Sequence, residues 1–275
     1  MYTLNCKGRL LVLDKPVVMG ILNITPDSFY SGSRIEQQDV LQKAGQMIEE
    51  GATILDIGGQ STRPGSDRLT AAEELNRVLP AIKIIKENYP SVFLSIDTYH
   101  AAVASETVAA GIDMVNDISA GDMDADMLST VASLNVPFIA MHMQGTPDTM
   151  QDKPTYDNIA KEVVDYFIQK TADCKAAGIT DIVIDPGFGF GKTINHNFQL
   201  LKQMEVLQLF QIPVLAGLSR KSTIWKTLHV TPEEALNGTT VLNTIALTKG
   251  ASILRVHDVK EAVEAIKLYE AYSNA

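Results

Sequence analysis

Polar side chains recur where short apolar runs of the sequence end. Asp97 closes VFLSID, Asn116 lies in DMVNDI, and Asp185 lies in DIVIDP. Other run ends carry Asn23, Thr62 with Arg63, His142, Ser219 with Lys221, and Arg255 with His257. If the runs are parallel strands, their carboxyl ends meet on one rim, where a barrel enzyme has its active site. The set therefore predicts an active site on that rim.

Arg255 and His257 suggest one kind of ligand. They stand two positions apart in the run SILRVH, so as strand residues they point to the same side. A guanidinium and an imidazole side by side suit a phosphate group. The alternative is an ion pair on the rim with no ligand.

Each of the other rim residues also has a structural alternative. Asp97 could cap a following helix, and Asn116 could satisfy backbone groups at a strand end. Asp185, which precedes a proline, could form a turn, and Lys221 could be a solvated lysine at a helix start. His142 is expected to be an ordinary interior histidine. The concentration of such residues on one rim favours function over these alternatives.

Two long segments follow the first two apolar runs. They are NITPDSFYSGSR at 23–34 and GGQSTRPGSDR at 58–68. Both exceed the usual length of about 2–6 residues for a strand-to-helix loop. Long loops at a barrel mouth are commonly lids or binding loops, although a tolerated surface insertion is the alternative.

Eight apolar runs alternate with amphipathic stretches, which is the pattern of repeated strand and helix. The runs are 17–22, 52–58, 92–97, 113–118, 137–142, 181–186, 213–219 and 252–257. The clearest helical patterns cover 38–52, 71–90, 158–179 and 233–251, and helices are expected to end at Gly51, Gly111, Gly178 and Gly250. Near-continuous apolar strands are covered on both faces, as in parallel sheets.

Eight such units in 275 residues predict one α/β domain over 1–275, a single (β/α)8 TIM barrel with a short N-terminal hairpin at 1–15. The rival fold is a doubly wound sheet, which usually has a phosphate loop. The stretch GFGFGKT at 187–193 fails as a Walker A loop because Pro186 stands where glycine is required. It also lacks the third glycine of a dinucleotide fingerprint.

Composition narrows the partners and the location. The net charge of −10 disfavours general binding to nucleic acid or to anionic membranes, although a local basic cluster can still bind an anion. Cys6 and Cys174 match no metal-ligand spacing or disulfide framework. No stretch resembles a signal peptide or a membrane span, so a cytoplasmic enzyme is expected.

Eight blocks together resemble dihydropteroate synthase over the whole chain. They are MGILNITPDSF (19–29), DIGGQSTRPG (56–65), SIDT (95–98), VNDIS (115–119), MHMQGTP (141–147), DPGFGFGK (185–192), GLSRKS (217–222) and RVHDV (255–259). STRPG, DPGFGFGK and SRK are specific only in combination. That family joins 6-hydroxymethyl-7,8-dihydropterin diphosphate to p-aminobenzoate and releases diphosphate.

The resemblance implies a role for each matched residue. The pterin pocket would hold Asp97, Asn116, Met141, Asp185, Lys221 and Arg255, with Asp97, Lys221 and Asp185 catalytic. The diphosphate would contact Asn23, Thr62, Arg255 and His257. The aminobenzoate would lie among Phe29, Thr62, Arg63, Pro64, Phe190, Ser219 and Lys221.

The resemblance also implies one magnesium ion, held through Asn23, and a homodimer, in a family that is the target of sulfonamides. The sequence departs from the family pattern in two places. Tyr30, Ser31, Gly32 and Ser33 replace the usual Ser-Asp-Gly-Gly, and Gln60 replaces a Glu. The first change affects contacts of loop 23–34, and the second removes a charge beside Arg63.

Three other functions are compatible with parts of the sequence. A methyltetrahydrofolate methyltransferase shares the pterin-binding barrel but has no need of STRPG or of the Arg255–His257 pair. An aldolase-type barrel would use Lys221 as a Schiff base, which borohydride trapping would reveal. A non-catalytic pterin-binding protein would keep Asp97, Asn116 and Asp185 without needing the two loops.

Overall fold

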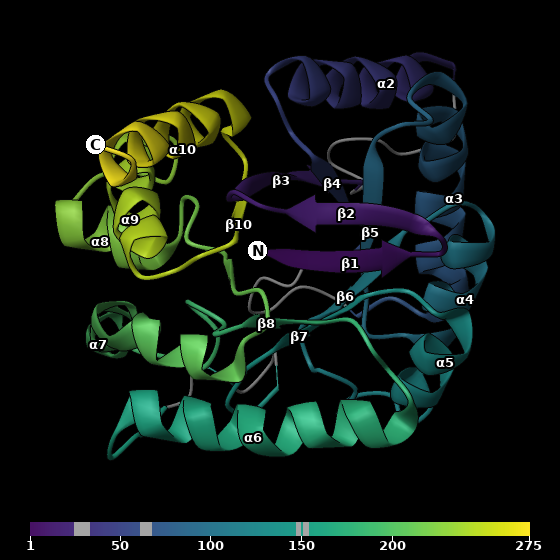
Figure 1. The fold of residues 1–275 in the computed structure, drawn as a ribbon. Coiled ribbons are helices and arrows are strands. Elements are labelled where there is room, and N and C mark those ends of the chain that lie inside the picture. The colour runs from purple at the N-terminus through teal and green to yellow at the C-terminus, as the bar shows by residue number, and fades with distance from the viewer. Residues whose placement is uncertain (25–33, 61–67, 147–149, 151–153) are drawn as a thin grey trace.

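In a computed structural model, eight parallel strands lie inside a ring of helices (Figure 1). The structure describes the chain except for 25–33, 61–67, 147–149 and 151–153, and describes only the backbone of 34–37. The elements in chain order are β1 Tyr2–Cys6, β2 Arg9–Leu13, β3 Val17–Asn23, α2 Arg34–Glu49, β4 Ile54–Gly58, α3 Ala71–Asn88, β5 Phe93–Asp97, α4 Ala101–Ala109, β6 Met114–Asp117, α5 Met127–Leu134, β7 Phe138–Met141, α6 Ile159–Ala177, β8 Ile182–Asp185, α7 Ile194–Gln203, the 3-10 helix η1 Met204–Phe210, β9 Leu215–Ala216, α8 Ser222–Leu228, α9 Leu236–Thr248, β10 Ile253–Val256 and α10 Val259–Ser273.

The strands pair in the order β8-β7-β6-β5-β4-β3-β10-β9, all parallel. A parallel bridge between Ile184 and Val214 joins the two outer strands and closes the barrel. The predicted (β/α)8 fold is therefore confirmed. The run 213–219 forms a shorter strand than expected, Leu215–Ala216. At its start Pro213 has no N–H to donate, although its carbonyl accepts from Ile184 N at 3.0 Å.

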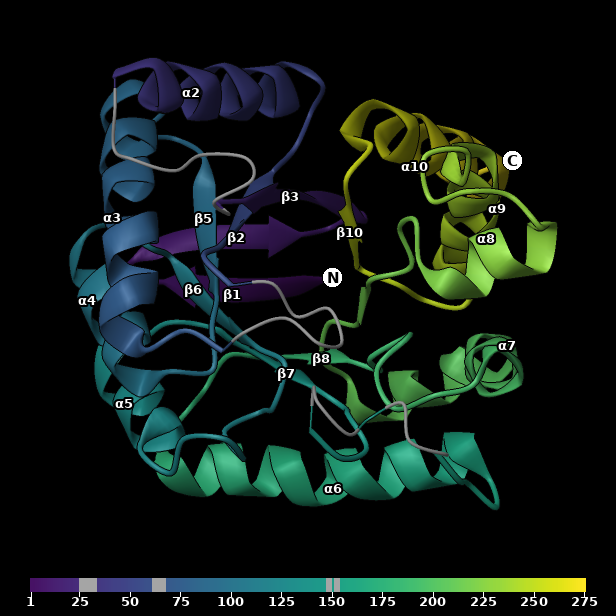
Figure 2. The ribbon, with the colours of Figure 1, turned by 180° about the vertical axis from the view of Figure 1, so that it is seen from behind.

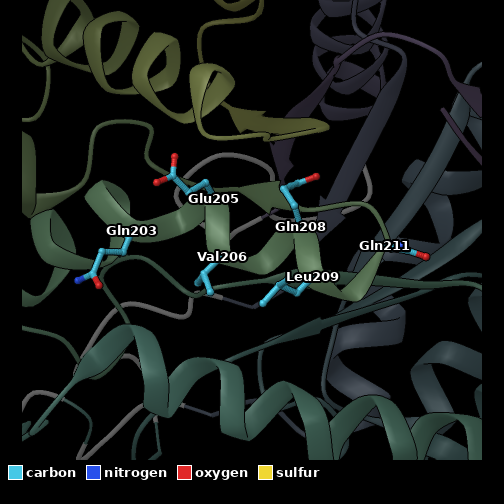
Figure 3. Close-up of a pocket in the computed structure, with 6 residues that line it drawn as sticks. All are labelled: Gln203, Glu205, Val206, Gln208, Leu209 and Gln211. Atoms are coloured by element: carbon cyan, nitrogen blue, oxygen red, sulfur yellow. The ribbon is translucent and has the colours of Figure 1, made fainter.

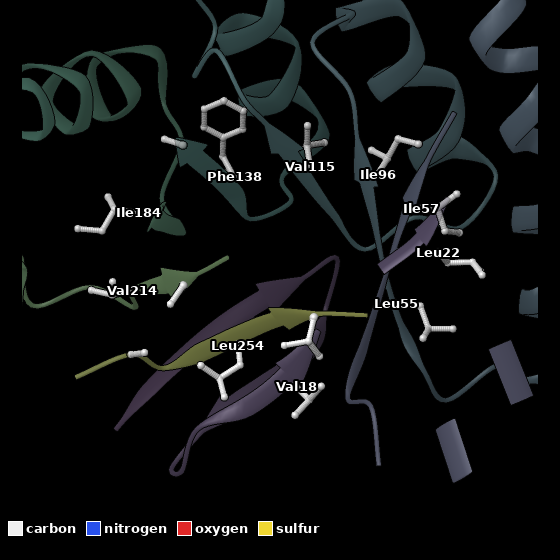
Figure 4. Close-up of a cluster of buried hydrophobic side chains, with 14 of the residues drawn as sticks. Val18, Leu22, Leu55, Ile57, Ile96, Val115, Phe138, Ile184, Val214 and Leu254 are labelled. Carbon is white, nitrogen blue, oxygen red and sulfur yellow. The ribbon is translucent and has the colours of Figure 1, made fainter. Parts of the chain in front are cut away.

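Outward-facing strand residues form the larger hydrophobic core. Val18, Leu55, Ile96, Val115 and Phe138 are all buried there against the surrounding helices (Figure 4). The helices form this outer layer on both views of the molecule (Figure 2). Because both faces of each strand are covered, the strands read as continuous apolar runs rather than as alternating ones.

Inward-facing residues near the start of the strands form an apolar floor. The floor residues are Met19, Ile54, Met114, Ile139, Val183, Leu215 and Ile253. The expected hairpin, β1 paired antiparallel with β2, packs Leu4, Cys6, Leu11 and Leu13 into the same cluster. Its two-residue turn has positive φ at Lys7 and Gly8, which suits the twist of a tight hairpin.

The next inward layer is polar. Successive side chains of a strand alternate between its faces, so the residue two positions after each floor residue also points inward. Asp56 follows Ile54 in this way, and Arg255 follows Ile253. Asn116 and Asp185 follow Met114 and Val183 in the same way. The fold thus places polar groups directly above a closed apolar floor.

The helix ends predicted from glycine are also confirmed. Gly51, Gly111, Gly178 and Gly250 all have positive φ. Gly178, for example, is the C-cap of α6 at φ 100°, and its N–H bonds back to the carbonyls of Cys174 and Lys175. A residue with a Cβ would be strained in that conformation, which explains why the helical pattern stops there.

Candidate active site at the carboxyl ends of the strands

Arg255 lies at the centre of the polar layer, between two carboxylates. Its Nε donates to Asp56 Oδ2 at 2.6 Å, and its Nη2 donates to Asp97 Oδ2 at 2.6 Å. Asp56 is fully buried, and the side chains of Arg255 and Asp97 are 18% and 11% exposed. Arg255 therefore links three strands, and the ion-pair alternative correctly describes its state in the structure.

Asn116 is held by the same carboxylate. Its Nδ2 donates to Asp56 Oδ2 at 3.0 Å, so the amide does not serve backbone groups at the strand end. Asp97 is not a helix cap either, because the N-cap of α4 is His100. Both residues thus face the barrel interior, as the site prediction required.

Asp185 and Lys221 lie near each other on the side of the pocket formed by β8 and the segment after β9. One oxygen of Asp185 accepts from Gly187 N at 2.7 Å, so the turn-forming alternative holds for that oxygen. A Cβ on Gly217 would lie 3.6 Å from Lys221 Nζ and 3.9 Å from Asp185 Oδ2. The absence of a side chain at Gly217 therefore leaves space beside both charged groups.

Burial changes the protonation of these groups. It raises the pKa of Asp97 to about 7, because the charge of Arg255 only partly offsets the loss of water and the nearby Asp56 adds repulsion. Burial raises the pKa of Asp185 against the effect of Lys221. It also lowers the pKa of Lys221 to about 8, opposed by Asp185. Groups titrating near neutrality in a polar pocket are typical of an active site.

The loop after β8 is held in place by the hydrogen bonds of a buried lysine, Lys192. Lys192 Nζ lies 2.8 Å from the Gly187 carbonyl, 3.0 Å from that of Phe190 and 2.9 Å from His142 Nδ1. A Cβ on Gly187 would collide with the carbonyl oxygen of His142, so only glycine fits there. His142 is a buried partner of this loop, as expected of an interior histidine.

Phe190 and Met141 form an apolar wall beside the polar groups. Met141 is buried with Tyr99 and Ile118, and Phe190 packs against this cluster while remaining partly exposed. Lys221 Nζ lies 4.7 Å from the centre of the Phe190 ring and donates to the carbonyl of Phe188. Lys221 is thus not a solvated surface lysine, although it is the N-cap residue of α8.

Ser219 and His257 form a hydrogen-bonded pair on the rim. Ser219 Oγ lies 2.9 Å from His257 Nδ1 and accepts from His257 N at 3.1 Å. Although His257 is exposed overall, rim atoms displace water from part of its ring. This desolvation, with the charge of Arg255, lowers the pKa of His257 to about 4, so the ring is neutral at pH 7.

Asn23 ends β3 on the same rim, pairs in register with Gly58 and is exposed. Phe29, Thr62, Arg63 and Pro64 lie outside the described residues, as do Tyr30–Ser33. The other departure from the family pattern, Gln60, is described, and its Nε2 donates to the hydroxyl of Tyr99 at 2.6 Å.

For two residues of this site, Asp56 and Lys192, the sequence predicts no role. Asp56 interrupts the apolar run ATILDIG with the same parity as Ile54, and that parity could have marked it as inward-facing. Lys192 ends a glycine-rich stretch that reads as a surface loop, and nothing local in the sequence signals that it is only 3% exposed.

A separate hollow lies over η1, which precedes β9 and is therefore at the opposite end of the barrel. Gln203, Glu205, Val206, Gln208, Leu209 and Gln211 line it (Figure 3). The hollow is lined mainly by glutamines with one carboxylate, and it is separate from the polar layer at the other end of the barrel. Where the structure describes the chain, no cluster of three His, Cys, Asp or Glu side chains could hold a metal, and no helix could span a membrane.

Comparison with known proteins gives consistent results. The sequence model of the pterin binding enzyme family matches residues 19–257. The chain is 44% identical to the dihydropteroate synthase of Escherichia coli K12, over 98% of this chain and 96% of the relative.

Solved structures give the same picture. The Yersinia pestis dihydropteroate synthase with a sulfonamide drug has a TM-score of 0.94 and 42% identity, with both chains covered completely. The Xanthomonas albilineans dihydropteroate synthase in complex with 7,8-dihydropteroate has a TM-score of 0.87 and 36% identity, with 99% of each chain covered.

Proposed function

The chain belongs to the pterin binding enzyme family, and on that premise we propose that it is a transferase with dihydropteroate synthase activity. It joins 6-hydroxymethyl-7,8-dihydropterin diphosphate to p-aminobenzoate and releases diphosphate, a step in folate synthesis. The observation that carries this function is the polar layer above a closed apolar floor, which suits a flat, polar heterocycle. The named relatives favour this activity over a methyltransferase, an aldolase or a non-catalytic binder.

The pterin is proposed to lie in the polar layer. The second oxygen of Asp185, which the Gly187 N–H leaves available, accepts from the amino and ring N–H groups of the pterin. Asn116 accepts from another donor of the ring, and Lys221 donates to a ring acceptor. Met141 packs on the ring face. These contacts use the alternating donors and acceptors of the heterocycle edge.

The charges of the pocket favour the reaction. Asp56, Asp97 and Asp185 outnumber Arg255 and Lys221 by one, so the described pocket has a net charge of −1 when all five groups are ionised. As the C–O bond breaks and diphosphate leaves, positive charge develops on the pterin, and Asp97 is placed to stabilise it. The aryl amine then attacks the carbon and loses its proton to solvent.

The leaving group is proposed to contact His257 and Arg255 on the rim, with Thr62 from the loop 58–68. Arg255 is already paired with Asp56 and Asp97, so it contributes through the guanidinium edge that these carboxylates do not occupy. A charge-assisted contact of this kind is worth about 1.5–3 kcal/mol. His257 would bind the diphosphate more strongly in its protonated form.

Magnesium is proposed to bind with the diphosphate through Asn23. A Cβ on Gly58 would lie 3.3 Å from Asn23 Oδ1 and 4.0 Å from Asp97 Oδ2, so the glycine leaves space between two oxygen donors. Mg²⁺ usually takes one or two protein oxygens and fills its other positions with phosphate oxygens and water, which suits this sparse donor set. When bound, the ion neutralises charge on the leaving group.

Aminobenzoate is proposed to lie at the mouth. Phe190 would pack on its ring, and Ser219 and Lys221 would face its polar ends. Phe29, Thr62, Arg63 and Pro64 complete this subsite by resemblance to the family. The complexes of relatives with a sulfonamide drug and with 7,8-dihydropteroate support a subsite for an aryl amine, and they support sulfonamide binding by this chain.

We also propose that the protein is a homodimer in the cytoplasm. Val241 and Ile245 on α9 are 49% and 38% exposed, and Leu268 and Tyr272 on the neighbouring α10 are 73% and 78% exposed. Four large exposed apolar side chains on two packed helices suit an interface with a second copy of the chain. Two buried free thiols suit a reducing compartment. We further propose that residues 1–275 form one domain, because the N-terminal hairpin and the barrel floor share one hydrophobic cluster.

The activity is tested by incubating the protein with magnesium, the pterin diphosphate and p-aminobenzoate and measuring dihydropteroate. Asp185→Asn serves as the matched loss-of-function variant, because an amide cannot accept from two donors as a carboxylate can. The expected result is product from the wild type and little from the variant. A wild-type protein that binds both substrates yet forms no dihydropteroate would refute the proposal. For the dimer, Leu268→Glu should shift sedimentation to the monomer.

A further inference from the structure

Asp56 lies at the junction of the pterin-facing groups but cannot itself reach a ligand. Its side chain is 0% exposed, and it lies one layer above the apolar floor on β4. One oxygen, Oδ2, accepts from Arg255 Nε at 2.6 Å and from Asn116 Nδ2 at 3.0 Å. The other oxygen, Oδ1, is also buried and has no hydrogen-bond partner among the described residues, so the contacts of Asp56 with the pocket run through Arg255 and Asn116.

The contact with Asn116 determines how that amide is oriented. An amide can present either its oxygen or its NH₂ group to a neighbour, but an ionised carboxylate can only accept a hydrogen bond. Asn116 must therefore turn its NH₂ toward Asp56. Arg255 Nε, which can only donate, bonds to the same oxygen at 2.6 Å, so Oδ2 acts as an acceptor there and this orientation is reinforced. The amide oxygen of Asn116 is left to face the pocket as an acceptor.

The contact with Arg255 fixes the guanidinium in the same way. Asp56 on β4 accepts a hydrogen bond from Arg255 Nε, and Asp97 on the next strand, β5, accepts one from Arg255 Nη2. A planar group bonded through two of its nitrogens cannot rotate freely. Without Asp56, Arg255 would keep only its bond to Asp97 and could swing toward the rim.

We propose that Asp56 is a positioning residue that sets the hydrogen-bonding polarity of the pocket, so that Asn116 accepts and only a ring with an N–H donor at that edge is bound tightly. This inference rests on the proposed function for the identity of the ring, a pterin. It differs from that function in assigning specificity to a residue that touches no substrate.

The first test is a double-mutant cycle with 6-hydroxymethyl-7,8-dihydropterin, which lacks the diphosphate, as the titrated probe. Asp56→Asn offers Asn116 an N–H donor, so the amide of Asn116 can turn over. The expected loss of affinity is about tenfold or more, as for a lost charge-assisted bond. In an Asn116→Ala background the same substitution should have a smaller effect, limited to what Asp56 contributes through Arg255, because the amide that it orients is missing.

Asp117→Asn is the matched control. Asp117 is also a buried carboxylate, but it serves the backbone N–H groups of Ser119 and Gly121 outside the pocket. It should lower thermal stability and change the affinity for the pterin far less than Asp56→Asn does, because its hydrogen bonds go to Ser119 and Gly121 and not to Asn116 or Arg255. Equal pterin affinity in folded Asp56→Asn and wild type would overturn the inference while leaving the proposed function intact. Failure of the wild type to bind the pterin would instead refute the proposed function.

A measurement on the wild type covers the case in which Asp56→Asn does not fold. The side-chain NH₂ signals of Asn116 can be identified in an ¹⁵N spectrum by their loss in Asn116→Ala. If the NH₂ faces Asp56, these signals should stay protected from exchange and shift little when the pterin binds. A large shift with loss of protection would mean that the NH₂ faces the ligand, and the positioning role would be wrong.

Discussion

The Nη2 atom of Arg255 donates to Oδ2 of Asp97 across 2.6 Å, which joins the last strand of the barrel to the third strand of its closed ring. This bond makes Arg255 part of the electrostatic environment of Asp97 rather than an isolated phosphate-binding arm. It follows that changing Arg255 should alter the titration of Asp97 as well as diphosphate binding.

The pH profile of kcat/KM should therefore have an acid limb near pH 7, set by Asp97 in the free enzyme. Activity requires the ionised carboxylate, so it should fall about tenfold per unit as pH drops below the pKa. Arg255→Ala removes the charge that lowers this pKa, whereas Asp56, Asp117 and Asp185 continue to raise it. The limb should move to higher pH in the residual activity of the variant.

Arg220→Ala provides the control for that experiment. Arg220 also forms an ion pair, with Asp258 at 2.7 Å, but it does not contact Asp97. Its loss should leave the acid limb in place. If the acid limb of Arg255→Ala coincides with that of the wild type, Asp97 does not set the limb and the prediction is wrong.

His257 should change protonation when diphosphate binds. In the free protein its pKa is about 4, and a bound anion favours the protonated ring, so the pKa should rise. NMR titration of the ring protons, with and without diphosphate, measures the change. The chain has only five histidines, and His142, with a pKa of about 2, should stay neutral throughout. A His257 that titrates normally in the free protein would contradict this prediction.

Diphosphate and aminobenzoate should bind cooperatively through Ser219. When His257 is neutral, the hydroxyl of Ser219 can donate to its Nδ1 at 2.9 Å. A protonated ring donates instead, which frees the hydroxyl for the carboxylate of aminobenzoate. Titration of labelled aminobenzoate should show about 5–150-fold tighter binding with magnesium diphosphate, and the reverse titration the same factor.

His257→Gln tests the route of this coupling, because glutamine can contact Ser219 but cannot gain a proton. The affinity for aminobenzoate alone should be preserved, and the enhancement by diphosphate should shrink. If both proteins respond equally to diphosphate, Ser219 is not the link and the loops 23–34 and 58–68 must provide it. If the wild type shows no enhancement at all, the aminobenzoate site is preformed.

Cys6 and Cys174 should be unreactive toward thiol reagents in the folded protein. Both are buried, and burial raises their pKa values to about 12 and about 11, which suppresses the thiolate. Leu11→Ala removes packing beside Cys6 in the floor cluster, at a cost of about 2–5 kcal/mol. Ellman's reagent should then modify Cys6 faster than Cys174. Equal rates would show that the hairpin does not open separately from the barrel.

The barrel and its polar rim were predictable because both depend on local patterns. The parity of Asp185 relative to Val183, for instance, is visible in one strand. The partner of Arg255 was not predictable in this way. Asp56 lies 199 positions away in the sequence, and only closure of the barrel brings the two together. Lys192 was missed for a different reason, since a lysine after GFGFG reads as solvated until its loop folds over it.

Among the described residues, the hairpin β1–β2 packs on the apolar floor at one end of the barrel, so a ligand reaches the polar layer from the rim. Two ligands that share one entrance must dissociate in order, and the deeper ligand can leave only after the shallower one has dissociated. An aryl amine or a sulfonamide at the mouth should therefore prolong the residence of a pterin beneath it, even when the two molecules do not touch. The product dihydropteroate occupies both the pterin and the aminobenzoate subsites, so it must dissociate as a single molecule through the same entrance.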